Sequence, residues 1–345
     1  MTQWQEFLQS RGASILDGRL QDFGAPAREL ASAQHEHVMA DLSHLGLLQV
    51  DGDDAVTFLQ GQLTNDVTLL NGSNSHYAGY CTAKGRLLAL FLAFSHQGHI
   101  HLQLNGSLLE PILKRLKMYV LRSKVVIQDV SARIVRIGVA GPNSAAILGA
   151  MFDAVPEEIH GISTQENGTL IRLPGTTPRF EIFTALENAQ ELWQELEQHF
   201  DPAGQAAWDW LEIEAGIPDI YPATQEAFVP QMVNLDALGG INFKKGCYTG
   251  QEIVARTHYL GKVKRRSLIG SLSASDSLPQ PGDEVFAGEG EAVGQVVRSS
   301  GIAGAEGRVL VELRQEASEG KTVSWQQQPI SWLPMPYAFP PDRKA

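Results

Sequence analysis

Cysteine is scarce in this sequence, whose 345 residues contain only Cys81 and Cys247. Two cysteines exclude a disulfide scaffold and a multi-cysteine metal site, and they favour a reducing, cytoplasmic setting. Long apolar runs are also lacking, so we expect no membrane-spanning helix. The first residues do not show the basic stretch and apolar run of a secretory signal. The hydrophobic content of 43% is that of an ordinary globular protein with a sizeable core.

Several familiar catalytic and binding signatures are lacking as well. The ten histidines show no metal-ligand spacing, and we find no phosphate-binding loop, dinucleotide fingerprint or nucleophile elbow. We therefore predict no metal site. Basic residues are outnumbered by acidic ones, 27 to 39, which gives a net charge of −12. Most of the surface should therefore repel nucleic acid.

The basic residues that are present lie close together in the sequence. Residues 244–266 hold seven Lys or Arg against one acid, and residues 114–124 hold five more and no acid. If the two segments meet in space, they form a positive site for a polyglutamate tail, a phosphate or an RNA backbone. The alternative is two separate solvated faces.

The pattern of apolar residues predicts an α+β protein with three domains. Strand-like and helical stretches from 46 to 130 follow the order β-α-β-β-β-α-β, which indicates a largely antiparallel sheet. A second unit has strands at 134–139 and 180–183 and helices at 145–151 and 188–200. A helix at 207–215 leads back toward Cys247, and six short strands after 263 predict a small β-barrel. The predicted domains are 1–131 completed by 206–262, then 132–205, and finally 263–345.

Cys247 is the first candidate for chemistry. Thr249 and Glu252 have the spacing of a capping box, so a helix should begin near Thr249, with Gly261 as its stop. A thiol just before a helix start is favoured as thiolate by exposed N–H groups, and Lys244 and Lys245 act in the same direction. The alternative is an inert, buried cysteine, which is our interpretation of the strand residue Cys81.

A second group of candidates could form a binding site for a flat ligand. Trp208 and Trp210 precede Glu212 and Glu214; an indole would stack on a pterin, and a carboxylate would bind its donor edge. The two glutamates diverge on a helix, so at most one should face a pocket. Further polar residues at element boundaries are Asn65, Asp66, Lys84 and Arg86, which taken alone are typical turn residues.

Several of these residues fall in stretches that resemble the YgfZ-type folate-binding proteins, relatives of the glycine-cleavage T-protein, an aminomethyltransferase. The matching stretches are 52–67, 81–86, 119–125, 213–218, 230–235 and 239–252. The most specific is Lys244-Lys245-Gly246-Cys247-Tyr248-Thr249-Gly250-Gln251-Glu252. The resemblance runs from about residue 40 into the C-terminal barrel.

The resemblance implies a three-domain, T-protein-like ring around a channel that binds tetrahydrofolate or a derivative. It also implies a role in maintaining iron–sulfur enzymes, including tRNA-thiolating ones, in which Cys247 is a redox group or transient ligand. Lys245, Tyr248, Gln251 and Glu252 would shape the cysteine loop. The expected folate contacts are Trp208, Glu214, Asn65, Asp66, Lys84 and Arg86. A second folate-contacting tryptophan of the family is replaced by Leu45 or Leu47.

The T-protein carries a catalytic aspartate shortly after a paired-glycine turn. The corresponding turn here, residues 84–89, contains no acid. We therefore predict a folate-binding accessory protein that supports iron–sulfur enzymes and thereby tRNA modification, with those proteins as partners. The alternatives are a folate-dependent one-carbon (aminomethyl) transferase and an RNA-binding module, whose direct tRNA binding would be weak because of the net charge.

Overall fold

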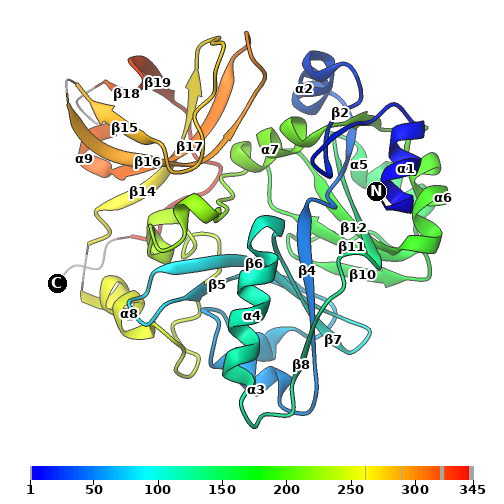
Figure 1. The fold of residues 1–345 in the computed structure, drawn as a ribbon, viewed down its shortest axis with the longest axis horizontal. Helices are drawn as coiled ribbons and strands as arrows, with labels where there is room; N and C mark the ends of the chain where they lie inside the picture. Colours follow the sequence, from blue (N-terminus) through cyan, green and yellow to red (C-terminus); the bar gives the residue numbers. More distant parts are fainter. Residues whose placement is uncertain (1, 261, 289, 319–321, 342–345) are drawn as a thin grey trace.

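The computed structural model describes residues 2–260, 262–288, 290–318 and 322–341 (Figure 1). The strands in these ranges form a five-stranded sheet, a six-stranded sheet, a closed six-stranded barrel and a two-stranded hairpin. Helices accompany the two open sheets, so the predicted α+β class is confirmed. No helix in the described ranges has the length and apolarity needed to cross a membrane.

The five-stranded sheet is antiparallel throughout. Its order is β5 (Ser75–Cys81), β6 (Leu87–His96), β7 (His99–Asn105), β4 (Leu45–Asp51) and β8 (Val126–Asp129). The first eight residues of β6 are all buried, which explains their unbroken apolar run. Helices α3 (Ala55–Gln60) and α4 (Leu109–Val120) accompany this sheet, and α4 packs on β4 and β8. The predicted strand and helix order of this unit is confirmed.

The six-stranded sheet contains residues from three separate parts of the chain. Its order is β10 (Ile162–Gln165), β11 (Gly168–Leu173), β12 (Arg179–Ala185), β9 (Ile134–Ala140), β3 (Val38–Asp41) and β13 (Asp201–Ala203). Side chains of helices α1 (Gln3–Ser10), α5 (Ser144–Met151) and α6 (Leu186–Leu196) and of this sheet form one hydrophobic core, in which Trp193 is fully buried. The domain boundaries stay a prediction, although the pairing of β3 with β9 places residues 38–41 in this sheet.

Helix α7 (Gln205–Glu214) lies where the other units meet. It packs on α2 (Pro26–His35), on β2 (Arg19–Asp22) of the hairpin with β1 (Ser14–Leu16), and on barrel strands β16 and β17. Figure 1 shows α7 between the six-stranded sheet and the barrel. The chain then passes through short helices η3 (Pro222–Thr224) and η4 (Pro230–Val233) to α8 (Gln251–Leu260).

The C-terminal segment closes into the predicted barrel. Its strands are β14 (Arg265–Leu272), β17 (Gly307–Arg314), β16 (Glu291–Ser300), β15 (Glu284–Ala287), β18 (Val323–Trp325) and β19 (Gln328–Trp332), with α9 (Gln315–Ser318) after β17. Valine and leucine side chains fill the interior. Since β14 pairs with both β17 and β19, the ring of strands has no free edge there.

Candidate functional site

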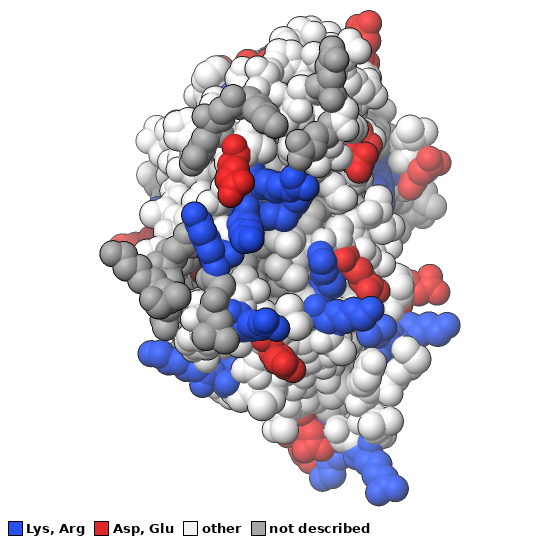
Figure 2. All heavy atoms as spheres, turned by 90° about the vertical axis from the view of Figure 1, so that its left-hand side faces the viewer, with Lys and Arg blue, Asp and Glu red and all other residues white. Residues whose placement is uncertain are grey.

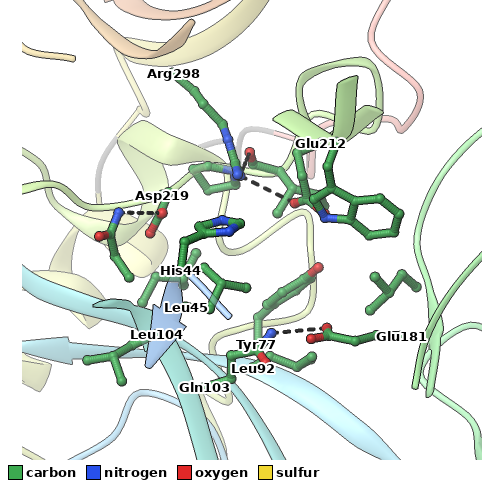
Figure 3. Close-up of a pocket in the computed structure, with 16 residues that line it drawn as sticks. His44, Leu45, Tyr77, Leu92, Gln103, Leu104, Glu181, Glu212, Asp219 and Arg298 are labelled. Carbon is green, nitrogen blue, oxygen red and sulfur yellow. Dashed lines mark hydrogen bonds and ion pairs between the residues drawn. The ribbon is translucent and has the colours of Figure 1, made fainter. Parts of the chain in front are cut away.

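A cavity lies where α7 meets the two open sheets and the barrel (Figure 3). Its empty space, including its open mouth, is about 550 Å³. Side chains from the five-stranded sheet, the six-stranded sheet, α7 and β16 line it. Leu45 and Leu47 are the two residues that could replace the family's second tryptophan. Leu45 lines the cavity, whereas Leu47 is buried in the core.

Gln103 and Glu181 form one side of the cavity. Gln103 Nε2 donates a hydrogen bond of 3.0 Å to Glu181 Oε2, and both side chains are buried. The amide oxygen Gln103 Oε1 and the other carboxyl oxygen, Glu181 Oε1, have no hydrogen-bond partner among the described residues. Burial raises the pKa of the Glu181 carboxyl to about 7. Two buried acceptors without donors each cost about 1–3 kcal/mol, so this pair is suited to a ligand that donates hydrogen bonds.

Trp208, the tryptophan expected to stack on a folate, lines the same cavity. Its side chain is only 3% exposed, and the Arg179 guanidinium lies 5.4 Å from the indole ring centroid. The ring packs on Gly138 of β9, where a Cβ atom would come within 2.5 Å of it. Glycine at this position therefore allows the indole to lie against the strand.

Glu212 connects the cavity to two arginines on different sheets. Its Oε1 accepts from Arg179 Nη1 at 3.0 Å, and its Oε2 accepts from Arg298 Nη1 at 3.3 Å. Arg298 also donates to Asp209 Oδ1 at 2.7 Å. Figure 3 shows Arg298 and Glu212 on the side of the cavity opposite Gln103 and Glu181, with Tyr77 between the two groups. These buried charges are therefore paired, as buried charges must be.

Burial raises the pKa values of two other polar groups of the cavity. Burial raises the pKa of Asp219 to about 6, although Asn105 donates a hydrogen bond to its carboxylate at 2.8 Å. Burial also raises the pKa of Tyr77 far above its usual value. Tyr77 thus remains a phenol and Asp219 exchanges its proton close to neutral pH.

Glu214 lies outside this cavity. It pairs with Arg308, whose guanidinium lies 4.5 Å from the centroid of the Trp210 ring, and these groups line a separate hollow. Because successive helical residues turn by about 100°, Glu212 and Glu214 point in different directions. The structure therefore brings Glu212, rather than Glu214, together with Trp208.

The sequence analysis missed several residues of the cavity, which are Gln103, Glu181, Asp219 and Arg298. A signal for some of them exists in the sequence. Glu181 lies between Phe180 and Ile182 in a strand, and Arg298 follows Val296 and Val297 in another. A charge in a buried strand must be paired or placed at a functional site, so this pattern could have singled them out.

The cysteine loop, residues 242–250, is fixed to the segment 61–66 by Lys245. The Lys245 ammonium donates to the carbonyl oxygens of Leu63 at 2.6 Å and Asn65 at 2.7 Å, and it lies 5.2 Å from the centroid of the Tyr248 ring. Burial lowers the pKa of Lys245 to about 8. Lys245 and Tyr248 are both buried, so they hold the loop in place and do not form its surface.

The turn at residues 82–86 packs against the end of the cysteine loop. Gly250 has a φ of +84°, and a Cβ atom there would lie 2.3 Å from the Thr82 carbonyl oxygen, so a larger residue would not fit. Lys84 is exposed, and Arg86 donates to the Ala227 carbonyl oxygen at 2.5 Å. The structure therefore places Lys84 and Arg86 beside the cysteine loop rather than in the cavity.

Cys247 itself is exposed, and it does not line the cavity that Trp208 lines. Helix α8 begins four residues later, at Gln251, and Glu252 in its first turn is exposed. Its expected stop, Gly261, lies outside the described residues. Cys81 is buried, and burial raises the pKa of its thiol to about 12. Cys247 is therefore the accessible thiol of the two.

Asn65 and Asp66 brace the segment that holds the loop. Asn65 Nδ2 donates to the carbonyl oxygens of Tyr77 and Gly239, at 2.9 and 2.8 Å. Asp66 accepts from Gln60 Nε2 at 2.7 Å. Neither residue lines the Trp208 cavity, but Asn65 lines a second hollow next to the cysteine loop. Across the described ranges, no three His, Cys, Asp or Glu side chains are grouped so as to hold a metal ion.

Comparisons with known proteins agree with this arrangement. The model of the GCVT N-terminal domain family matches residues 7–243. The chain is 34% identical to the tRNA-modifying protein YgfZ of Sodalis glossinidius, over 75% of this chain and 79% of that protein. It is 31% identical to the protein of the same name from Pectobacterium carotovorum, over 89% of this chain and 94% of that protein. The glycine cleavage system aminomethyltransferase T from Bartonella henselae is 20% identical, with a TM-score of 0.73 and 96% of each chain covered. This last likeness confirms the predicted T-protein-like fold.

Proposed function

Because this chain belongs to the GCVT N-terminal domain family and, within it, to the YgfZ proteins, we propose that it is a folate-binding accessory protein. In this proposal it acts in the cytoplasm, where it supports iron–sulfur enzymes and through them tRNA modification. The relatives' name, tRNA-modifying protein, supports the last part. The folate part depends on the cavity, and the iron–sulfur part depends on Cys247.

The observation that carries folate binding is the pair of unpartnered oxygens, Gln103 Oε1 and Glu181 Oε1. The pterin ring of a folate carries an amino group and a ring N–H on one edge, which are two donors side by side. An ionised carboxylate and an amide oxygen would accept from that edge with charge-assisted strength. Trp208 would stack on the flat face of the ring. Bound tetrahydrofolate would supply a carrier of one-carbon units.

Cys247 is proposed as a transient ligand for iron in a client protein. Its thiol would lose its proton, and the resulting thiolate would donate an electron pair to iron. The exposure of Cys247 supports this role, because a client must approach from outside. Since the surrounding loop is fixed by Lys245 and Tyr248, the thiol is presented at a constant position.

A folate-dependent transferase is the second candidate, and one observation favours it. Asp219 and Glu181 both line the cavity, and burial brings their pKa values to about 6 and about 7. Such values suit a general acid or base at neutral pH. Consumption of methylene-tetrahydrofolate in the presence of an amine donor would favour this candidate, and its absence would favour the accessory role.

Two experiments test the leading proposal. Titration with tetrahydrofolate should change the tryptophan fluorescence of the wild type and change it less in Trp208→Phe. An unchanged wild-type signal, confirmed by calorimetry, would contradict folate binding. A strain that lacks the gene should regain iron–sulfur enzyme activity with the wild type and with Cys81→Ser but not with Cys247→Ser. Full rescue by Cys247→Ser would remove the thiol from the proposal.

A further inference from the structure

The face of the molecule that carries α8 is basic, although the protein as a whole is acidic. Figure 2 shows Lys and Arg side chains gathered over the middle of this face, with few Asp and Glu among them. Exposed basic residues on and around α8 are Lys84, Lys244, Arg256, Lys262 and Lys264. Lys84 belongs to this group because the adjacent Gly85 packs on Ile253 of α8. We call this group the α8 face.

The second basic segment, residues 114–124, includes part of α4, which contacts β5 near the cysteine loop. Arg115 of α4 contacts the Tyr80 hydroxyl on β5. The next residue on β5, Cys81, is close enough to Tyr248 of the cysteine loop to influence the pKa of the Tyr248 hydroxyl. Lys114 and Lys117, which flank Arg115 in sequence, are exposed. Both α4 and the cysteine loop therefore lie near the end of β5.

A hollow beside the cysteine loop opens on the α8 face. Its empty volume, including open space, is about 950 Å³, and Phe243, His258 and Tyr259 form its aromatic part. The Phe243 and His258 rings are stacked with centroids 3.6 Å apart, and Tyr259 meets both edge to face. Tyr259 is 47% exposed, so part of its side chain faces solvent.

The hollow also contains polar groups that point to a ligand. The side chain of His76 is buried, with an exposed fraction of only 9%. Its Nε2 atom has no hydrogen-bond partner among the described residues. Lys244 lines the same hollow and carries the nearest exposed positive charge. A flat ring with polar edge atoms would cover the aromatic surface and give His76 Nε2 a partner.

We propose that the α8 face binds RNA, with phosphates over its exposed Lys and Arg side chains and one unstacked base in the hollow. The positive charge attracts the backbone, and the aromatic surface stacks a base, which are the two features of single-stranded nucleic-acid sites. An acidic protein would also satisfy the charges, but RNA carries a phosphate and a flat ring with polar edge atoms in every nucleotide. The acidic remainder of the protein repels RNA and so favours binding at this face.

The inference rests on the tRNA part of the proposed function and not on folate binding. Cys247 is exposed on the same loop that contributes Phe243 and Lys244. RNA on the α8 face would therefore lie next to the thiol. The site is then a place where an RNA and a client enzyme meet.

Binding of fluorescently labelled bulk tRNA to the full chain, followed by anisotropy at several salt concentrations, tests the charge part. We expect affinity to fall with salt, and Lys244→Gln and Arg256→Gln each to lower the slope of log K against log salt by about 0.9. The matched control is Arg19→Gln, an exposed arginine on the β1–β2 hairpin, which should leave the slope unchanged. Equal effects of all three variants, or no tRNA binding by the wild type, would overturn the proposal.

Tyr259→Ala tests the stacking part. It should weaken binding of a single-stranded RNA oligomer about tenfold at an unchanged salt slope, while Tyr259→Phe should bind like the wild type. Duplex RNA should compete poorly, because its bases are already stacked. If a polyglutamate peptide competes as well as the RNA oligomer, the face is an acidic-protein site and the proposal is wrong. If Tyr259→Ala binds like the wild type, no base stacks in the hollow and the proposal is also wrong.

The folate titration separates this inference from the proposed function. Loss of tRNA binding in a protein that still binds tetrahydrofolate would remove the RNA site alone. Normal tRNA binding with the expected variant pattern, in a protein that does not bind tetrahydrofolate, would support the RNA site and remove the folate cavity alone.

Discussion

Gln103 of β7 donates a hydrogen bond to Glu181 of β12 at 3.0 Å and thereby joins the five-stranded sheet to the six-stranded sheet. Burial places the pKa of Glu181 at about 7, so its charge changes near physiological pH. An ionised carboxylate accepts hydrogen bonds more strongly than a protonated one. The properties of the cavity should therefore depend on pH.

Folate affinity should rise with pH through about 7. Below this value Glu181 is mostly protonated, and its free oxygen is a weak acceptor for a pterin edge. At about pH 6 roughly one tenth of Glu181 is ionised, so binding of tetrahydrofolate should be about tenfold weaker than at about pH 8. Fluorescence titrations at the two pH values measure this difference. Glu181→Gln is the control, since its affinity should be nearly the same at both; an equal pH effect in the variant would remove Glu181 from the site.

The same carboxyl should influence stability in the opposite direction. A folded-state pKa raised from about 4.5 to about 7 means that the native state binds a proton more tightly than the unfolded chain. The free energy of unfolding therefore falls as pH rises through this window, on the order of 1 kcal/mol for each unit of pKa difference. In urea unfolding, the wild type should lose stability relative to Glu181→Gln between about pH 5 and pH 8. A constant difference between the two proteins would contradict this expectation.

The sequence predicts the fold well where patterns are long and local. Strand β6 has an unbroken apolar run, and it is found close to its predicted position, as are β7, helix α7 and the six barrel strands. Strand β3 was not predicted. It has four residues, and its partner β9 lies about a hundred residues further along the chain. Such pairing depends on tertiary structure that no local pattern records.

The site could be predicted only in part, again because its geometry depends on contacts between residues that are distant in sequence. Helical spacing predicted that at most one of Glu212 and Glu214 faces a pocket, but each lines a hollow of its own. The rotation of α7 about its axis decides which of the two shares a cavity with Trp208. That rotation is fixed by packing on α2 and β16, which are distant in sequence. Trp208 lies in the cavity as expected, whereas the position of Lys84 beside α8 depends on contact between two turns.

Glu212 should be far more important for stability than Glu214. Glu212→Ala leaves Arg179 and Arg298 without one of their buried carboxylate partners, and loss of one partner of a buried ion pair costs about 3–5 kcal/mol. Glu214 is partly exposed, and its pair with Arg308 should contribute about 1 kcal/mol or less. Urea unfolding of the two alanine variants tests this contrast. Similar losses in both would mean that the buried network is not stabilised as the contacts indicate.

Lys245 should control which thiols of the chain react. In the wild type, a thiol reagent should modify the exposed Cys247 quickly and the buried Cys81 slowly, since burial also raises the pKa of Cys81 to about 12. Lys245→Met keeps an unbranched side chain, shorter by the terminal nitrogen, and leaves the Leu63 and Asn65 carbonyl oxygens without this donor. Each lost bond costs about 1–3 kcal/mol, so the loop should open at least tenfold more often and expose Cys81 beneath Tyr248. Mass spectrometry of the labelled protein follows each cysteine separately. Lys244→Met, at an exposed neighbour, should leave the Cys81 rate unchanged; a slow Cys81 in Lys245→Met as well would show that other contacts hold the loop.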